Sequence, residues 1–92
     1  MGSKVAVVDL FCGVGGLTCG LRKAGLDVVA GIDNDASCRY AYEENNHTRF
    51  IEADVSRLPS VDVDSMFGKA DIKILVGCAP CQRFSQHSNK YR

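Results

Sequence analysis

The sequence lacks any apolar stretch approaching the roughly 20 residues that a membrane-spanning helix needs. Its first residues, Met1-Gly2-Ser3-Lys4, also lack the apolar run of a signal peptide. Net charge is absent as well, because eleven basic side chains cancel eleven acidic ones. No overall field therefore attracts a polyanion, so a nucleic-acid surface would have to be local or supplied by other sequence. We expect a soluble chain with no membrane partner.

A regular disulfide framework is also missing, because the five cysteines are odd in number and irregular in spacing. This usage fits a reducing cytoplasm. Cys78 and Cys81 form a C-x-x-C pair, which is compatible with half a zinc site or a redox pair. A zinc site needs two further ligands, and His47 and His87 do not supply a second paired motif. We expect no metal site, and we expect the remaining cysteines to pack as small apolar side chains: Cys12, Cys19 and Cys38.

Short apolar runs alternate with helical patterns along the 92 residues. The runs predict strands at about 4–10, 27–32, 49–52 and 71–77, with helices at about 16–24, 36–44 and 61–67. Gly25 stands where the first helix should stop. This order predicts a Rossmann-like α/β fold with a parallel sheet. In such a sheet the fourth strand would have an unpaired apolar edge, so we expect the amino-terminal part of a larger or split domain.

A glycine-rich turn, Phe11-Cys12-Gly13-Val14-Gly15-Gly16, follows the first predicted strand. Gly13 and Gly15 permit positive φ angles and close approach of a ligand to the backbone. Thr18 occupies the place of the third glycine in the dinucleotide fingerprint, which disfavours NAD. A tight structural turn is an alternative interpretation. Asp9, a carboxylate within an apolar strand end, favours a ligand site instead.

Acidic residues follow the second and third predicted strands. Asp33 and Asp35 come about 20 residues after the glycines, where α/β folds hold a ribose diol. Either Asn34 or Asp35 could cap the next helix, which accounts for one of the two aspartates but not easily for both. Asp54 follows the third strand and has the same two interpretations. Together with the glycine turn, these acids predict a nucleoside cleft.

The fourth predicted strand runs into Gly77-Cys78-Ala79-Pro80-Cys81. Pro80 restricts the backbone of this loop, and Cys81 supplies a thiol. Open α/β sheets carry their chemistry at the carboxyl ends of strands, so Cys81 is a candidate nucleophile. Its thiolate would need a lowered pKa, from a nearby cation or a helix start.

These motifs, in this order and spacing, resemble the amino-terminal part of the cytosine-5 DNA methyltransferase family. The segment 9–17 resembles the family's first motif, which binds S-adenosylmethionine. The segments 31–36 and 52–55 resemble the second and third motifs, and Pro80-Cys81-Gln82 with Phe84-Ser85 matches the fourth. The resemblance covers nearly the whole chain and implies a methyltransferase fold that is incomplete after its fourth strand.

The resemblance also implies a role for each matching residue. Asp33, commonly Glu in the family, would bind the ribose hydroxyls, and Asp54 would bind the adenine amino group. The implied cofactor-binding set is Asp9, Phe11, Gly13, Val14, Gly15, Gly16, Leu17, Asp33, Asn34, Asp54, Val55 and Pro80. Cys81 would be the catalytic nucleophile, and the substrate loop would contain Gln82, Phe84 and Ser85.

The implied reaction is transfer of a methyl group from S-adenosylmethionine to C5 of a cytosine flipped out of DNA. The family's Glu-Asn-Val motif and its recognition region would follow Arg92. Residues 1–92 are therefore expected to form the cofactor-binding and nucleophile-bearing part of the domain, and to need its remainder or a second chain. The alternatives are a non-catalytic or split-subunit partner and a related transfer-RNA methyltransferase. The expected location is the bacterial cytoplasm, or the nucleus in a eukaryote.

Overall fold

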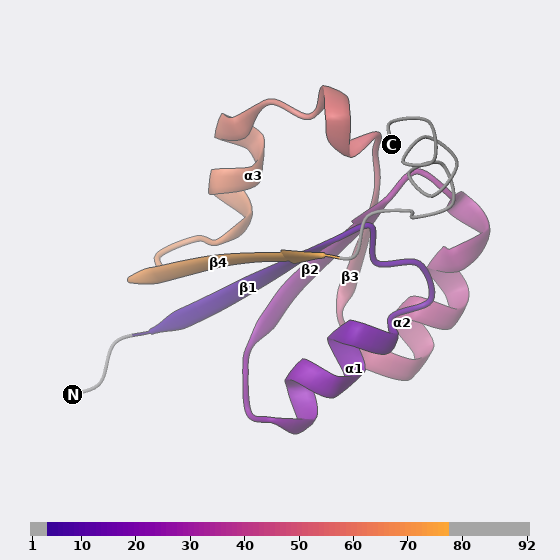
Figure 1. Ribbon diagram of the computed structural model, residues 1–92, viewed down its shortest axis with the longest axis horizontal. Helices are drawn as coiled ribbons and strands as arrows, with labels where there is room; N and C mark the ends of the chain where they lie inside the picture. The colour runs from indigo at the N-terminus through magenta and orange to yellow at the C-terminus, as the bar shows by residue number, and fades with distance from the viewer. Residues whose placement is uncertain (1–3, 78–92) are drawn as a thin grey trace, which may run out of the picture.

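The computed structural model describes residues 4–77, which form a parallel four-stranded sheet with helices on both faces (Figure 1). The strand order is β3-β2-β1-β4. The strands are β1 (Val5–Leu10), β2 (Val28–Asp33), β3 (Arg49–Glu52) and β4 (Ile72–Gly77). The helices are α1 (Gly16–Lys23), α2 (Arg39–Asn46) and α3 (Ser60–Met66), with short 3₁₀ helices η1 (Ala36–Cys38) and η2 (Val55–Arg57). Helices α1 and α2 lie on one face and α3 on the other, so the predicted parallel α/β sheet is confirmed.

Strand β1 lies at the centre of the sheet, between β2 and β4. Ala6, Val7 and Val8 are fully buried, because both faces of this strand are covered. A strand of this kind needs a continuous apolar run instead of alternation, which is why the sequence pattern located it. All predicted strand bounds agree with the structure to within one residue.

The helix ends follow from local backbone chemistry. Helix α1 stops where Gly25 adopts a φ of +92°, and the Leu26 N–H donates to the Leu21 carbonyl at 3.0 Å, as in a Schellman motif. The predicted stop at Gly25 is confirmed. The helix predicted at 36–44 is different: η1 comes first, and α2 continues to Asn46 before His47 turns left-handed at φ +51°.

Two apolar clusters hold the layers together. Beneath α3 the core contains Ala6, Val8, Ile32, Phe67 and Ala70. On the opposite face, Tyr42 of α2 packs edge-on against Phe50 of β3, with ring centroids 5.8 Å apart, and Cys12 completes this cluster. The second cluster lies under the loop that follows β1, so it supports the candidate site from beneath.

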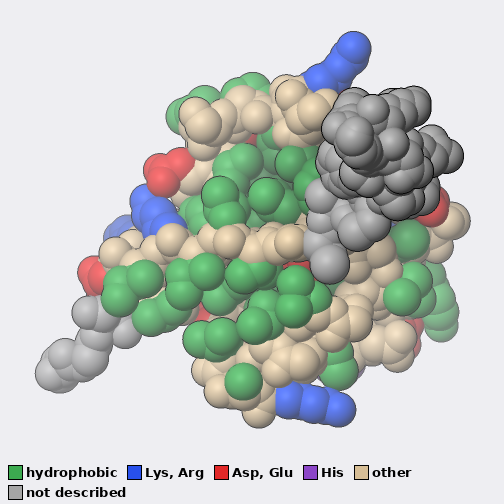
Figure 2. Space-filling view, in the orientation of Figure 1, with side chains coloured by type: hydrophobic (Ala, Val, Ile, Leu, Met, Phe, Trp, Pro, Cys, Tyr) green, Lys and Arg blue, Asp and Glu red, His purple; other side chains and the backbone are tan. Residues whose placement is uncertain are grey.

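Strand β4 forms one edge of the sheet. Two of its apolar side chains, Ile72 and Leu75, are 47% and 53% exposed. Figure 2 shows hydrophobic side chains on both sides of this strand. The prediction of an unpaired apolar edge at 72–77 is confirmed for the part of the chain that the structure describes. Within the same residues, no helix has the length and apolar character that crossing a bilayer requires.

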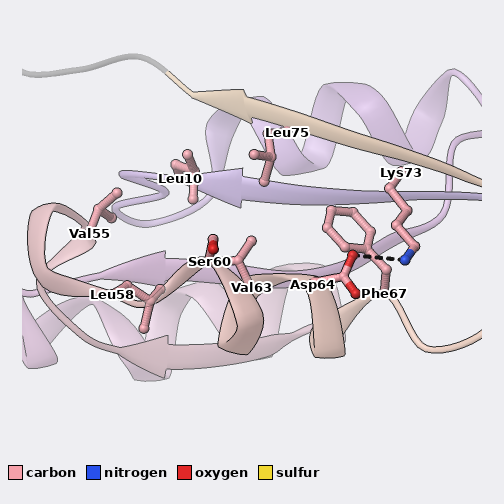
Figure 3. Close-up of a pocket in the computed structure, with 9 residues that line it drawn as sticks. All are labelled: Leu10, Val55, Leu58, Ser60, Val63, Asp64, Phe67, Lys73 and Leu75. Carbon is pink, nitrogen blue, oxygen red and sulfur yellow. Dashed lines mark hydrogen bonds and ion pairs between the residues drawn. The ribbon is translucent and has the colours of Figure 1, made fainter.

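A groove of about 400 Å³ lies between α3 and the strands β1 and β4 (Figure 3). Its walls are mainly apolar, and they are formed by Leu10, Val55, Leu58, Ser60, Val63, Asp64, Phe67, Lys73 and Leu75. At one end the Lys73 ammonium donates to the Asp64 carboxylate at 2.8 Å, which links β4 to α3. Because both charges are partly exposed, this pair orients the helix more than it stabilises the fold.

Candidate functional site

The loops that follow β1 and β2 lie side by side at the carboxyl edge of the sheet. Leu10 is in register with Ile32, and the Cys12 N–H donates to the Ile32 carbonyl at 3.0 Å. Parallel strands bring these two loops to the same edge although about 20 residues separate them in sequence. The edge is where open α/β sheets bind their ligands.

The glycine turn adopts the left-handed backbone conformations that its sequence predicts. Gly13 has a φ of +53° and Gly15 a φ of +96°, and the Gly15 N–H donates to the Cys12 carbonyl at 2.9 Å. Phe11 also has a positive φ, of +58°, which is uncommon for an aromatic residue. Its side chain is 39% exposed, so the turn presents this ring at the surface. Strained backbone of this kind concentrates at functional sites.

Asp33 joins the glycine turn to the loop after β2. Its Oδ2 accepts the Gly13 N–H at 2.8 Å, and its Oδ1 accepts the Asp35 N–H at 3.0 Å. The sequence predicted that Asp33 and the glycines would share one site, and the structure brings them into direct contact. Each carboxylate oxygen has a further lone pair, so the group can still accept hydroxyl hydrogens from a ligand.

Asp35 is the residue that caps the next helix, which resolves the choice between Asn34 and Asp35. Its carboxylate accepts the Ser37 N–H at 3.0 Å and the Ser37 hydroxyl at 2.6 Å. These hydrogen bonds lower the pKa of the Asp35 carboxyl. Asn34 is exposed between the two aspartates. The cap accounts for Asp35 and leaves Asp33 for the turn and a ligand.

Asp54 has the same capping arrangement one strand further along. It accepts the Ser56 N–H at 3.0 Å and the Ser56 hydroxyl at 2.7 Å, and these bonds lower its pKa. Its other oxygen is 4.0 Å from the Arg57 guanidinium. Val55 lines the groove beneath α3 and packs against the core there. The predicted contacts of Asp54 and Val55 with a cofactor stay predictions.

Asp9 lies beneath the turn, with only 1% of its surface exposed. The Thr18 hydroxyl donates to its Oδ2 at 2.6 Å, which provides the partner that a buried carboxylate requires. Burial raises the pKa of Asp9, and the nearby charge of Asp33 raises it further, against the lowering effect of the Thr18 bonds. Asp9 therefore supports the turn from below, a role that its sequence position alone did not distinguish from ligand contact.

Cys12 is a structural thiol in this arrangement. It is 7% exposed, and burial, followed by the charges of Asp9 and Asp33, raises its pKa to about 12. A thiol of such high pKa stays protonated and is a poor nucleophile. The expectation of apolar packing is confirmed for Cys12 and for Cys38, which is half-buried against the same cluster; Cys19 is half-buried on α1.

Among residues 4–77, nothing covers the outer surface of the turn. A side chain added at Gly13 or Gly16 would meet no atom of these residues within 4 Å, whereas one added at Gly15 would collide with Tyr42 and Asn46. Val14 and Leu17 expose apolar side chains beside this opening. The first N–H groups of α1 have no carbonyl acceptor within the helix, so those that Asp9 does not use can donate to acceptor atoms of a ligand. The turn thus combines open glycines, apolar side chains and hydrogen-bond donors.

The sequence patterns assigned no supporting role to three further residues that lie beneath this turn: Thr18, Tyr42 and Asn46. All are at most 1% exposed. Tyr42 and Asn46 are four residues apart on α2 and therefore share one face, and the Asn46 side-chain amide donates to the Tyr42 carbonyl at 3.1 Å. The signal that could have found them is a tyrosine and an asparagine at helical spacing on the face that packs against the sheet.

The predicted nucleophile and its loop lie outside the described residues: Pro80, Cys81, Gln82, Phe84 and Ser85. Their roles stay predictions. Between residues 4 and 77, no cluster of three or more histidine, cysteine, aspartate or glutamate side chains could hold a metal ion.

The parallel sheet and its covering helices define a Rossmann-like protein. At the carboxyl edge of the sheet, the glycine turn after β1 and Asp33 at the end of β2 form one site. A family model, C-5 cytosine-specific DNA methylase, matches residues 5–91. The chain belongs to the C-5 cytosine-specific DNA methylase family.

Individual relatives agree with the family match. The chain is 59% identical over 87 residues to type II methylase M.HgiDII of Herpetosiphon aurantiacus, covering 95% of this chain and 25% of that protein. It is 40% identical over 85 residues to type II methyltransferase M.XorII of Xanthomonas oryzae, covering 85% of this chain and 19% of that protein. The crystal structure of S. pombe Dnmt2 methyltransferase superposes with a TM-score of 0.71 at 28% identity, over 86% of this chain and 24% of that one. The chain thus spans about a quarter or less of the length of these relatives.

Proposed function

We propose that this chain is the cofactor-binding and nucleophile-bearing part of a DNA cytosine-5 methyltransferase. In this proposal S-adenosylmethionine binds at the glycine turn, and the methyl group is transferred to C5 of a cytosine in DNA. The observation that carries the proposal is the direct bond between Gly13 and Asp33, which unites the glycine turn and the ribose-binding acid of the family in one site.

The chemistry of the site fits a nucleoside that carries a cation and no phosphate. Each of β2 and β3 ends on an acidic residue and has a second one two positions later: Asp33, Asp35, Glu52 and Asp54. Such a set would repel a diphosphate and attract a sulfonium and an amino group. The packed side chain of Thr18 in place of a third glycine also argues against a dinucleotide.

The residues of the turn then have distinct tasks. Asp33 would accept hydrogen bonds from the ribose hydroxyls, and Asp54 would accept one from the adenine amino group. Phe11, Val14 and Leu17 would cover the apolar parts of the ligand. When bound, S-adenosylmethionine supplies an electrophilic methyl group.

Cys81 would act on the DNA substrate. Its thiolate adds to C6 of a cytosine that has been flipped out of the duplex, which makes C5 electron-rich enough to accept a methyl group. Loss of the C5 proton to a base, followed by cleavage of the bond between Cys81 and C6, restores the aromatic ring and the thiolate. We place this reaction in the bacterial cytoplasm, or in the nucleus of a eukaryotic source.

Turnover requires more polypeptide than the described residues in this proposal. The exposed Ile72 and Leu75 on β4 and the apolar groove beneath α3 are surfaces that a larger domain would cover. M.HgiDII and M.XorII are about four and five times as long as the regions that match this chain. We therefore propose that the partner is the carboxy-terminal part of the same domain, or a second chain that supplies it.

Replacement of Asp33 tests the cofactor proposal. We expect Asp33→Ala to weaken S-adenosylmethionine binding by about 1.5–3 kcal/mol, roughly 10- to 150-fold, because hydrogen bonds to a charged acceptor are lost. Isothermal titration measures the affinity, and thermal unfolding monitors the folded fraction.

Asp35→Ala is the matched control for Asp33→Ala. Asp35 is also an exposed aspartate in the loop after β2. Its carboxylate, however, accepts two hydrogen bonds from Ser37 and thereby caps the next helix. Its loss should lower the stability of the fold by removing the cap, and it should weaken the affinity far less than Asp33→Ala does. Equal affinities of the wild type and Asp33→Ala for S-adenosylmethionine would show that Asp33 does not contact the cofactor.

A further inference from the structure

The Tyr42 side chain packs beneath the glycine turn. It extends from α2, is fully buried, and packs against Phe50 of β3. A Cβ atom at Gly15 would lie 2.7 Å from the Tyr42 ring, and one at Gly31 would collide with the Tyr42 hydroxyl end. The ring therefore fills the space that these two glycines leave, and it lies against the turn at Gly15, β2 at Gly31 and β3 at Phe50.

The Tyr42 hydroxyl continues into a directed chain of hydrogen bonds. The Thr18 hydroxyl donates its single hydrogen to Asp9 Oδ2 at 2.6 Å. The Tyr42 hydroxyl, 2.8 Å from Thr18 Oγ1, must therefore donate to Thr18. Burial raises the pKa of Tyr42 to about 12, so its hydroxyl stays protonated as this arrangement requires. The chain of bonds ends on a buried carboxylate, which makes its last link charge-assisted.

This chain of bonds holds both ends of the turn. Asp9 precedes the turn on β1, and Thr18 is the third residue of α1, directly after it. The Thr18–Asp9 bond thus fixes the first turn of the helix against the strand, and Tyr42 fixes Thr18. Asn46 packs against Gly15 on the same side. A binding loop that is already ordered loses less conformational freedom when its ligand arrives.

We infer that Tyr42 and Thr18 are positioning residues for the cofactor: they hold the first turn of α1 in its binding geometry without touching the ligand. The inference rests on the proposed function of the turn. Removal of the Tyr42 hydroxyl, in Tyr42→Phe, should weaken S-adenosylmethionine binding by roughly three- to tenfold, which is the range of one hydrogen bond.

The test compares hydroxyl-deleting variants with a variant that only destabilises. Tyr42→Phe and Thr18→Val remove links of the chain of bonds, whereas Thr18→Ser keeps the hydroxyl. Phe67→Leu is the control, because Phe67 is buried in the cluster beneath α3, on the opposite face of the sheet. Cofactor affinity is measured by calorimetry on the folded protein, and amide hydrogen exchange is measured at Cys19, whose N–H bonds the Gly15 carbonyl at 2.9 Å.

We expect weaker cofactor binding and faster amide exchange at Cys19 in Tyr42→Phe and Thr18→Val. In Thr18→Ser and Phe67→Leu, both quantities should stay near their wild-type values after correction for global stability. Wild-type affinity and exchange in Tyr42→Phe would overturn the inference. So would equal changes in Phe67→Leu, because the effect would then be general destabilisation. Failure of the wild type to bind S-adenosylmethionine would refute the proposed function instead, and the exchange measurement would still decide whether Tyr42 orders the turn.

Discussion

Replacement of Gly15 by alanine should destabilise the fold by about 2–4 kcal/mol. Gly15 has a φ of +96°, where a side chain strains the backbone. The added methyl group would also lie 2.7 Å from the Tyr42 ring and would collide with Asn46. Neither neighbour can yield easily, because both are at most 1% exposed. Urea unfolding followed by circular dichroism measures the loss.

The adjacent glycine provides the matched control. Gly16 begins α1, and a methyl group there would meet no atom of the described part of the chain within 4 Å. Gly16→Ala should therefore preserve stability or raise it by up to about 1 kcal/mol, since alanine is the better helix former. It should nevertheless weaken S-adenosylmethionine binding roughly tenfold or more, as overpacking against the ligand would. Wild-type stability of Gly15→Ala would show that Tyr42 does not pack beneath the turn.

Replacement of Cys81 by serine should lower methyl transfer to DNA by on the order of 10³-fold or more, because an alcohol at neutral pH cannot replace a thiolate as the attacking group. The assay measures transfer of labelled methyl groups in the assembly that supports turnover. Affinity for S-adenosylmethionine should stay within about twofold, since loss of a nucleophile does not remove the cofactor's contacts.

Cys19→Ser is the control for this experiment. Cys19 is a half-buried thiol on α1, and its replacement should leave methyl transfer near the wild-type rate. Retained turnover in Cys81→Ser would contradict the covalent mechanism. Equal loss of cofactor binding in Cys81→Ser would make Cys81 a structural residue.

The sequence predicted the central strands well because β1 and β2 are mostly buried and therefore form apolar runs. The run from Val5 to Leu10 is apolar except for Asp9, as expected of a central parallel strand that ends at a site. Gly25 marked the end of α1 because a left-handed residue is needed there. The start of α2 was placed wrongly, since the Asp35 cap first produces a 3₁₀ turn. Propensity does not distinguish that turn from the first residues of an α-helix.

The candidate site was predictable where it depends on backbone and charge, and not where it depends on packing. Gly13 and Asp33 were expected to share a site, and they are hydrogen-bonded. The contact of Tyr42 with Thr18 joins residues 24 positions apart, and it depends on how α2 lies across the sheet. A single sequence does not specify how α2 is oriented on the sheet. Sequence position allowed Asp54 to be a cap or a ligand-binding residue; its observed bonds form a cap, and its contact with a cofactor stays a prediction.

The most direct test of the central claim is a calorimetric titration of the folded protein with S-adenosylmethionine, with NAD titrated in parallel. The acidic edge, the open glycines and the buried Thr18 predict saturable binding of S-adenosylmethionine at one site and no measurable binding of NAD. Absence of S-adenosylmethionine binding by the folded protein, or preferential binding of NAD, would contradict the assignment of the glycine turn as the methyl-donor site.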